Sequence, residues 1–266
     1  MRIPYRPRGV LRTTVATGDW DVRLHRPAPD LAPFVDHYWI VRWDLRGRPP
    51  HRQQVLSHPN LHVVFEQPHP AIYGVVRDVF ERELSGVGHV FGIRFRAGGF
   101  RPFLAGPVAE LTDRVLPAVD LFGPAITHVS DTVLDTPDEA GRVAHAETWL
   151  RGTLPTPGDP DPLIAEVATI VDRLTANPTL FRVDELAEEV GMSVRRLQRL
   201  FAEYVGVGPK WVLRRARLQE VAERAEHGAG IDWAALAADL GYADQAHLTR
   251  DFTATVGTAP GRYARA

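Results

Sequence analysis

The sequence contains no cysteine, and this absence excludes several kinds of chemistry. A chain without thiols cannot form a disulfide, a thiolate zinc site or a cysteine nucleophile. No run of ~20 apolar residues is present either, so a membrane-spanning helix is not expected. The first residues carry arginines but lack the apolar segment of a secretion signal. We therefore expect a soluble cytoplasmic protein without a membrane partner.

Positive charge is supplied almost entirely by arginine, because Lys210 is the only lysine in the chain. The net charge is −2, a value that does not indicate a nucleic-acid partner. Residues 193–217, however, contain seven positive side chains and one negative one, Glu203. DNA affinity depends on local neutralisation of phosphates, so such a basic segment is sufficient for binding. A solvated helix surface is the plainer explanation for a charge run taken alone.

The chain divides at residues 154–162, where the sequence LPTPGDPDP places four prolines and a glycine within nine residues. Such a segment continues neither a helix nor a central strand, so it is predicted to be an interdomain linker. Before it, short apolar or alternating runs predict strands over residues 35–43, 61–65 and 89–95, and residues 136–151 look helical. After it, helical periodicity continues to the C-terminus. The fold class predicted is α+β, with a β-rich, barrel-like domain over 1–153 and an all-α domain over 163–266.

An internal repeat lies within the second half. LAEEVG at 186–191 recurs as LAADLG at 236–241, fifty residues later. After one inserted residue the offset becomes fifty-one, and further positions of the same residue type stay in register: Leu197 with Leu248, Arg199 with Arg250, Phe201 with Phe252, Gly206 with Gly257, and Pro209 with Pro260. Two copies of one supersecondary unit explain this register better than chance does.

Each copy has the pattern of a helix, a glycine turn and a second helix. Gly191 and Gly241 suit the left-handed position that ends a helix. Ser193 and Asp244 suit the N-cap of the helix that follows, where a side-chain oxygen accepts a hydrogen bond from a free backbone N–H. This order of signals is typical of the helix-turn-helix motif.

The second helix of each copy is predicted to have one buried and one exposed face. In the first copy the inward residues are Val194, Leu197, Leu200, Phe201 and Tyr204, and in the second they are Leu248, Phe252 and Val256. The remaining polar residues can read bases, because arginine bonds guanine and glutamine bonds adenine through two hydrogen bonds. The candidates for direct base contact are Arg195, Gln198, Arg199, Gln245, Ala246, His247 and Arg250. Solvation of a helix surface is the alternative, and we favour it for Arg196 and Thr249.

Residues 209–227 are predicted to form a helix that links the two motifs, with Leu213, Leu218, Val221, Ala222 and Ala225 buried. Nineteen residues at a rise of about 1.5 Å span roughly 28 Å. This length is close to the ~34 Å between successive major-groove faces, so one chain can place two recognition helices in adjacent grooves. Weaker candidates for phosphate contact are Ser193, Lys210, Trp211, Arg214 and Arg215.

The second half of the chain resembles the AraC/XylS family of transcription regulators. The motifs that carry the resemblance are residues 186–218 and residues 236–265, including Gly241-Tyr242, Arg250 with Phe252, and Pro260. The final Tyr-Arg of the family is spaced here as Tyr263-Ala264-Arg265. The resemblance implies sequence-specific binding of double-stranded DNA through the two recognition helices named above, and contact with RNA polymerase if the protein is an activator.

The first half is similar to an uncharacterised β-rich domain often found before this DNA-binding unit, through FGIRFRAGGFRPFL at 91–104 and LTDRV at 111–115. The resemblance implies that this half senses a small-molecule effector or mediates homodimerisation. Trp39 and Trp43 are candidates to line an effector pocket, and Arg94 and Arg96 to meet an anionic effector. Packing in the core and ordinary surface exposure account for the same residues.

A histidine cluster offers a different function, a metal-dependent barrel enzyme fused to a DNA-targeting domain. His58, His62 and Glu66 would point to the same side of a strand, with His51 and His69 nearby. Scattered surface or core histidines explain the cluster more simply. We therefore predict no metal, no cofactor and no enzymatic activity.

Overall fold

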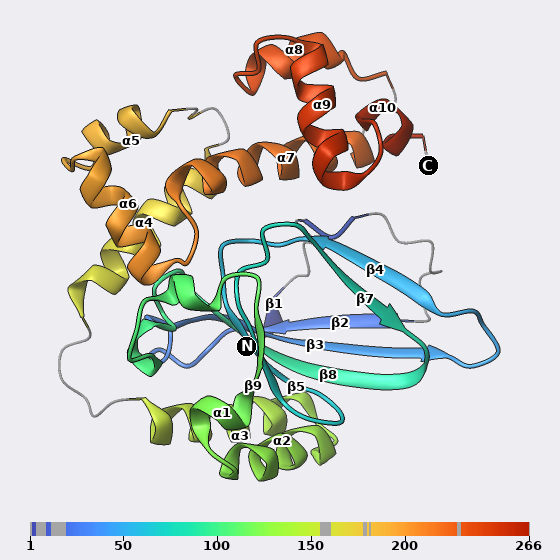
Figure 1. The fold of residues 1–266 in the computed structure, drawn as a ribbon. Helices are drawn as coiled ribbons and strands as arrows, with labels where there is room; N and C mark the ends of the chain where they lie inside the picture. The colour runs from blue at the N-terminus through green and yellow to red at the C-terminus, as the bar shows by residue number, and fades with distance from the viewer. Residues whose placement is uncertain are drawn as a thin grey trace.

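The computed structural model describes residues 2–3, 9–11, 20–154, 161–177, 180, 182–227 and 230–265. Most of the predicted linker, and most of the segment considered for a secretion signal, lie outside these residues. The chain begins with strands and ends with helices, so the predicted α+β class is confirmed (Figure 1). Within the described residues, no helix has both the length and the apolar character needed to cross a membrane.

The strands form one large sheet and one separate ribbon. The sheet is antiparallel and has the order β1 (Arg2–Ile3), β2 (Trp20–His25), β3 (Val35–Leu45), β8 (Gly86–Phe95), β5 (His62–Phe65), β6 (Ala71–Tyr73) and β9 (Val115–Pro117). The two remaining strands, β4 (His51–Leu56) and β7 (Val79–Leu84), pair with each other as a ribbon. The strands predicted from sequence correspond to β3, β5 and β8, at the centre of the sheet.

The two faces of the sheet are covered differently, because side chains alternate along each strand. Tyr38 and Ile40 of β3 are fully buried on one face. Helices cover this face, and Trp149 packs edge-on against Phe65 of β5 with ring centroids 5.7 Å apart. The helices that cover this face are α1 (Ala118–Phe122), α2 (Ala125–Asp135) and α3 (Glu139–Thr153). The β4–β7 ribbon lies on the opposite side of the sheet (Figure 1).

The helix predicted over residues 136–151 corresponds to α3, which begins three residues later than predicted. α2 ends at Asp135 and α3 begins at Glu139. Pro137 lies between them, and proline disfavours helical geometry in the residue before it. Asp138 then caps α3 by accepting a hydrogen bond of 2.8 Å from the backbone N–H of Gly141.

Among its described residues, the C-terminal part contains helices and the turns between them, and no strand. Its helices are α4 (Pro162–Ala176), α5 (Val183–Glu189), α6 (Val194–Tyr204), α7 (Pro209–His227), α8 (Trp233–Asp239), α9 (Gln245–Val256) and α10 (Pro260–Tyr263). The predicted linking helix over 209–227 has the bounds of α7, so this prediction is confirmed. Its predicted apolar stripe is also buried.

The hydrophobic clusters do not divide at the predicted linker. One cluster joins the sheet and its helices to α4, α5, α6 and the first turns of α7, where it includes Val212 and Leu213. A second cluster joins the rest of α7, α8 and α9 to Leu11 and to Leu56 of the ribbon. Helix α7 therefore contributes to both clusters, and each helix-turn-helix motif packs against a part of the N-terminal half.

Polar contacts hold α7 against the ribbon as well. The Arg215 guanidinium donates hydrogen bonds to the backbone oxygens of Arg77, at 2.5 Å, and Asp78, at 3.3 Å. One turn further on, Gln219 Nε2 donates to the backbone oxygen of Leu56 at 2.8 Å. Both side chains are buried, with Arg215 only 3% exposed. Unpaired buried carbonyls are costly, so these bonds fix the position of α7 on the ribbon.

Replacing Arg215 with methionine tests this contact. The apolar stem is kept, but the buried carbonyls of Arg77 and Asp78 lose their donor, so we expect the free energy of unfolding to fall by about 1–3 kcal/mol. Urea denaturation followed by circular dichroism measures this difference. The matched control is Arg224→Met on the exposed side of α7, with an expected change below about 0.5 kcal/mol. Equal effects of the two variants would contradict the role given to Arg215.

Candidate nucleic-acid interface and internal cavity

The turns of the two helix-turn-helix motifs have the same geometry. Gly191 and Gly241 adopt positive φ angles of 65° and 66°. Each is followed by a residue whose N–H donates 2.9 Å back to the first helix, Met192 to Ala187 and Tyr242 to Ala237. This is the pattern of a helix that ends at a left-handed glycine. The predicted role of both glycines is confirmed.

The second helix of each motif begins with the predicted cap. Ser193 Oγ accepts a hydrogen bond of 3.2 Å from the N–H of Arg196, in the first turn of α6. Asp244 Oδ1 accepts one of 2.6 Å from the N–H of His247, in the first turn of α9. These bonds satisfy backbone donors that a helix leaves free at its first turn. Both helices therefore start at a fixed residue, which sets the rotation of their exposed faces.

All seven candidates for base contact are exposed on α6 and α9. Across the described part of the chain, the side chains of Arg195, Gln198, Arg199, Gln245 and Arg250 make no hydrogen bond and no ion pair. The ring of His247 is held in place, since Nδ1 accepts from the Ala243 N–H at 3.4 Å and the ring meets Tyr242 edge-on. Unbonded arginine and glutamine donors are thus free to meet a ligand. Whether they contact DNA stays a prediction.

The buried faces of these helices follow the sequence prediction with one exception. Leu197, Phe201, Leu248 and Phe252 are fully buried. Val194 is exposed, which corrects its predicted inward position. It is the first residue of α6, and no preceding turn covers it there.

The candidates for phosphate contact have different surroundings. Lys210 is exposed, and Trp211 is half-buried. The Arg215 guanidinium lies over the Trp211 ring, with its central carbon 4.8 Å from the ring centroid. Arg214 pairs with Asp251 of α9 at 2.7 Å and also donates to Thr255. Arg214 therefore braces α9 against α7.

Arg215 does not have the position expected of a phosphate contact. Its guanidinium is buried against the carbonyls of Arg77 and Asp78, and this burial lowers its pKa to about 10. A guanidinium enclosed by α7 and the ribbon cannot reach a DNA backbone in this arrangement. The expectation for Arg215 is therefore corrected. Arg214 and Arg215 are adjacent arginines in the same basic segment, so the sequence alone did not show that Arg215 would be buried against the ribbon.

A cavity of about 310 Å³ lies between the sheet and the β4–β7 ribbon. This volume is near the lower end of the roughly 300–1,000 Å³ typical of small-molecule sites. Tryptophans and branched aliphatic residues dominate its walls, and polar groups lie among them. The lining includes Trp20, Val22, Trp39, Val41, Trp43, Val55, His58, His62, Val64, Glu66, Tyr73, Phe80, Arg82, Leu84, Val90 and Arg94.

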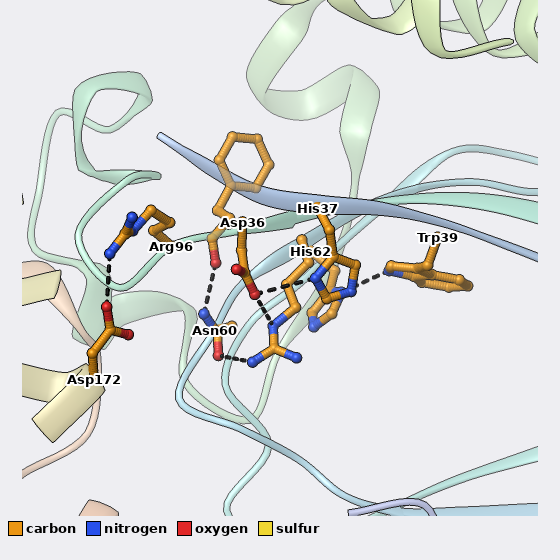
Figure 2. Close-up of polar contacts among 9 residues, drawn as sticks. Asp36, His37, Trp39, Asn60, His62, Arg96 and Asp172 are labelled. Carbon is orange, nitrogen blue, oxygen red and sulfur yellow. Dashed lines mark hydrogen bonds and ion pairs between the residues drawn. The ribbon is translucent and has the colours of Figure 1, made fainter. Parts of the chain in front are cut away.

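Three of the four candidate effector residues line this cavity: Trp39, Trp43 and Arg94. Arg96 does not. Its guanidinium forms an ion pair of 2.7 Å with Asp172 of α4, away from His62 and Trp39 (Figure 2). Arg96 follows the last residue of β8, where the chain has left the cavity wall. Its expected place in the pocket is therefore corrected.

Asp36, His37 and Asn60 lie in one group of polar side chains (Figure 2), and Arg94 contacts both Asp36 and Asn60. Arg94 donates to Asn60 Oδ1 at 2.8 Å and lies 3.2 Å from Asp36, while Asn60 donates to the backbone oxygen of Phe95 at 2.7 Å. Burial alone would raise the pKa of Asp36, but the hydrogen bond from His37 and the charge of Arg94 hold it well below its usual range. Arg94 thus has a carboxylate partner.

His62 takes part in the same region. The Trp39 indole N–H donates to His62 Nδ1 at 3.1 Å. Burial, followed by the charge of Arg94, holds the pKa of His62 well below its usual value. His62 is therefore a neutral imidazole at neutral pH, with the tautomer that leaves Nδ1 as acceptor.

A second polar group on the cavity wall joins the sheet to the ribbon. Glu66, only 7% exposed, accepts hydrogen bonds from Tyr73 at 2.5 Å and from Arg82 of β7 at 2.8 Å. Burial, followed by the bond to Glu66, raises the pKa of Tyr73, so its hydroxyl keeps its proton.

Two glycines that sequence reasoning missed shape the floor of the cavity. Gly88 and Gly92 of β8 lie directly opposite Trp43 and Trp39 of β3. A Cβ at residue 88 would overlap the Trp43 ring, and one at residue 92 would overlap the Trp39 ring. The indoles therefore lie down across β8. One feature of the sequence could have predicted this floor: two glycines four residues apart in a strand run that is otherwise rich in β-branched and aromatic residues.

The histidine cluster does not assemble into a metal site. His58, His62 and Glu66 all line the cavity, but only His62 lies within a strand, β5, so the predicted strand spacing does not explain their positions. Over the described ranges, however, no three His, Asp or Glu side chains come close enough together to hold a metal ion.

Comparisons with known proteins agree with the division of the sequence into a β-rich and a helical part. Residues 186–266 match the family described as a helix-turn-helix domain, and residues 23–117 match a domain of unknown function. The helix-turn-helix match covers both repeats described above.

Among solved structures, the chain is similar to an AraC-type transcriptional regulator from Chromobacterium violaceum (22% identity, 39% of this chain and 90% of that chain, TM-score 0.34). It is also similar to the DNA-binding domain of AdpA, a global transcriptional factor solved in complex with a target DNA (25% identity, 40% and 92%, TM-score 0.34). A third similar structure is ToxT from Vibrio cholerae (10% identity, 93% and 94%, TM-score 0.41).

Residues 186–266 thus belong to a helix-turn-helix domain, preceded by a domain whose family has no assigned function. This family match supports a role in DNA-binding transcription regulation.

A pair of glycine substitutions tests the turn geometry. A Cβ added to either Gly191 or Gly152 would meet open space, but only Gly191 has a positive φ. We expect Gly191→Ala to lower the free energy of unfolding by about 1–2 kcal/mol, because L-residues are strained in the left-handed region. The matched change Gly152→Ala, within helix α3, is expected to stabilise by about 0.4–1 kcal/mol. Denaturant titration of both variants measures this, and the same sign for both would contradict the account.

Proposed function

We propose that this protein is a sequence-specific transcription regulator in which α6 and α9 are two recognition helices that enter adjacent major grooves. One observation carries the proposal. The two motifs share the same turn geometry and each has a side-chain cap, and each presents exposed arginine and glutamine side chains without partners among the described residues. Within the part of the chain that the structure describes, these side chains make no hydrogen bond or ion pair that stabilises the fold, and they recur on two equivalent helices. This arrangement favours a role in recognition of a ligand.

The chemistry of the two rows suits base edges in the major groove. In α6, Arg195 and Arg199 can donate two hydrogen bonds to guanine, and Gln198 can pair in the same way with adenine. In α9, Gln245 and Arg250 offer the same chemistry, His247 offers a ring of fixed orientation, and Ala246 fits a thymine methyl group. The rows differ in sequence, so we expect an asymmetric site with a different half-site for each helix.

The separation of the two helices is set by α7. Its nineteen residues span about 28 Å, near the ~34 Å of one DNA turn. Ser193 and Lys210 are exposed and can contact phosphates, which would fix the register of each helix without reading sequence. Arg214, by pairing with Asp251, contributes to the relative position of α7 and α9.

We infer further that the cavity of the β-rich domain, residues 1–153, binds a small-molecule effector. The β4–β7 ribbon forms one wall of the cavity through Val55, Phe80 and Leu84. The same ribbon meets α7 through the carbonyl of Leu56. A ligand that displaced the ribbon would therefore change the position of α7 and so the placement of the two motifs on DNA. Homodimerisation or a contact with RNA polymerase would add to this regulation.

Two single substitutions test the recognition helices. Sites selected by the wild-type protein from random-sequence DNA serve as the probe, and fluorescence anisotropy at constant salt gives Kd. We expect Arg199→Ala and Arg250→Ala each to weaken binding by about 1–3 kcal/mol, and to relax preference at one base position in different half-sites.

Arg196→Ala is the matched control, because it removes the same charge from the same helix without removing a predicted base contact. It should weaken binding to all sequences by a small and uniform factor. If Arg199→Ala behaved like Arg196→Ala, with unchanged base preference, α6 would not be a recognition helix.

A further inference from the structure

We propose that the cavity between the sheet and the β4–β7 ribbon selects a planar, uncharged aromatic molecule of about two fused rings. The proposal rests on the effector role given to this cavity above and names the chemical class of the ligand. Three features carry it: an aromatic floor, stiff apolar walls, and the absence of an unpaired charge among the described lining residues.

The floor of the cavity presents indole surfaces. Trp39 and Trp43 lie across Gly92 and Gly88 of β8, and because glycine has no Cβ, the rings can pack directly against this strand. Both indole N–H groups already have acceptors, His62 Nδ1 for Trp39 and the Ser85 carbonyl for Trp43. Because their N–H groups are already hydrogen-bonded, the indoles present only their aromatic surfaces to the cavity. Such surfaces favour an aromatic ligand in stacked or edge-on contact.

The walls above and beside the floor are stiff. Valines line the cavity from both layers, and a β-branched side chain has few rotamers through which to adapt. Phe80 and Leu84 add apolar surface from the ribbon. A narrow, preformed site favours a rigid ligand, because a flexible chain loses more conformational freedom on binding.

The charged side chains on the cavity wall are already paired. Arg94 forms an ion pair of 3.2 Å with Asp36, without a hydrogen bond from its buried Nε, and bonds Asn60, and Arg82 bonds Glu66. A charge on the ligand would therefore be buried without a free counter-ion, at a cost in binding free energy. This pairing argues against a carboxylate ligand, although Arg94 and Arg96 in the sequence suggested an anionic effector.

Calorimetric titration of the full-length protein without DNA tests the class. The probes are 2-naphthol, 2-naphthoate, 2-naphthylmethylammonium and 1-decanol, which share similar size but differ in charge or rigidity. We expect 2-naphthol to bind at least tenfold more tightly than each of the others, a difference of about 1.4 kcal/mol. Equal or tighter binding of an ion overturns the uncharged class, equal binding of 1-decanol overturns the planar class, and no binding of 2-naphthol overturns both.

Substitutions on one strand locate the binding. Val90 of β8 lines the cavity, whereas Val87 of the same strand is 60% exposed and does not. We expect Val90→Phe to weaken 2-naphthol binding at least tenfold and Val87→Phe to leave it unchanged, with far-UV circular dichroism showing both folded. Val41→Leu, a smaller change on the cavity wall, replaces Val90→Phe if that variant does not fold, with the same direction expected. Wild-type affinity in a folded cavity variant would place the ligand elsewhere.

The titrations contain no DNA, so they separate the ligand class from the regulatory role. Failure of every probe would leave DNA recognition by α6 and α9 intact. Loss of DNA recognition would conversely leave a ligand site that still binds 2-naphthol.

Discussion

The arrangement of the molecule depends on the packing of one helix, α7, into two hydrophobic clusters at once. Its first turns contribute Val212 and Leu213 to the cluster of the sheet and the first motif, and its later turns contribute Leu218 and Val221 to that of the second motif. A single helix joins the two clusters, so neither motif can shift without disturbing the other. The distance between the two exposed helices α6 and α9 follows from this packing.

The β4–β7 ribbon gives the same helix a second role. Along β4, Val55 faces the cavity, while the neighbouring Leu56 is fully buried in the cluster of the second motif. The ribbon pairs with no strand of the large sheet among the described residues, apart from side-chain contacts such as that between Glu66 and Arg82. It is therefore a thin wall between the cavity and α7, the helix that joins the two helix-turn-helix motifs. Proteins that change state on binding a ligand need an element of this kind, which both sites contact.

Local chemistry was predictable from the sequence, and packing between distant segments was not. The left-handed glycines, the Ser193 and Asp244 caps and the bounds of α7 follow from short-range rules and are confirmed. Short patterns did not distinguish Arg215 from Arg214, or Arg96 from Arg94, because their roles depend on the partners they meet: backbone carbonyls of the ribbon for Arg215 and Asp172 of α4 for Arg96. The sequence predicted that Trp39, Trp43 and Arg94 line a pocket, but it did not predict the glycines beneath the two tryptophans, because the floor pairs β3 with β8 about fifty residues away. The roles given to the exposed residues of α6 and α9 remain predictions.

The most direct test of the account is the footprint of the full-length protein on DNA that it selects, mapped by hydroxyl radicals and by methylation of guanine in the major groove. Two recognition helices on one chain predict methylation interference in two successive major grooves, about 10 base pairs apart, with different sequences in the two half-sites. Protection of a single groove, or two identical half-sites in inverted order, would show that the motifs of one chain do not read adjacent grooves and would contradict the account.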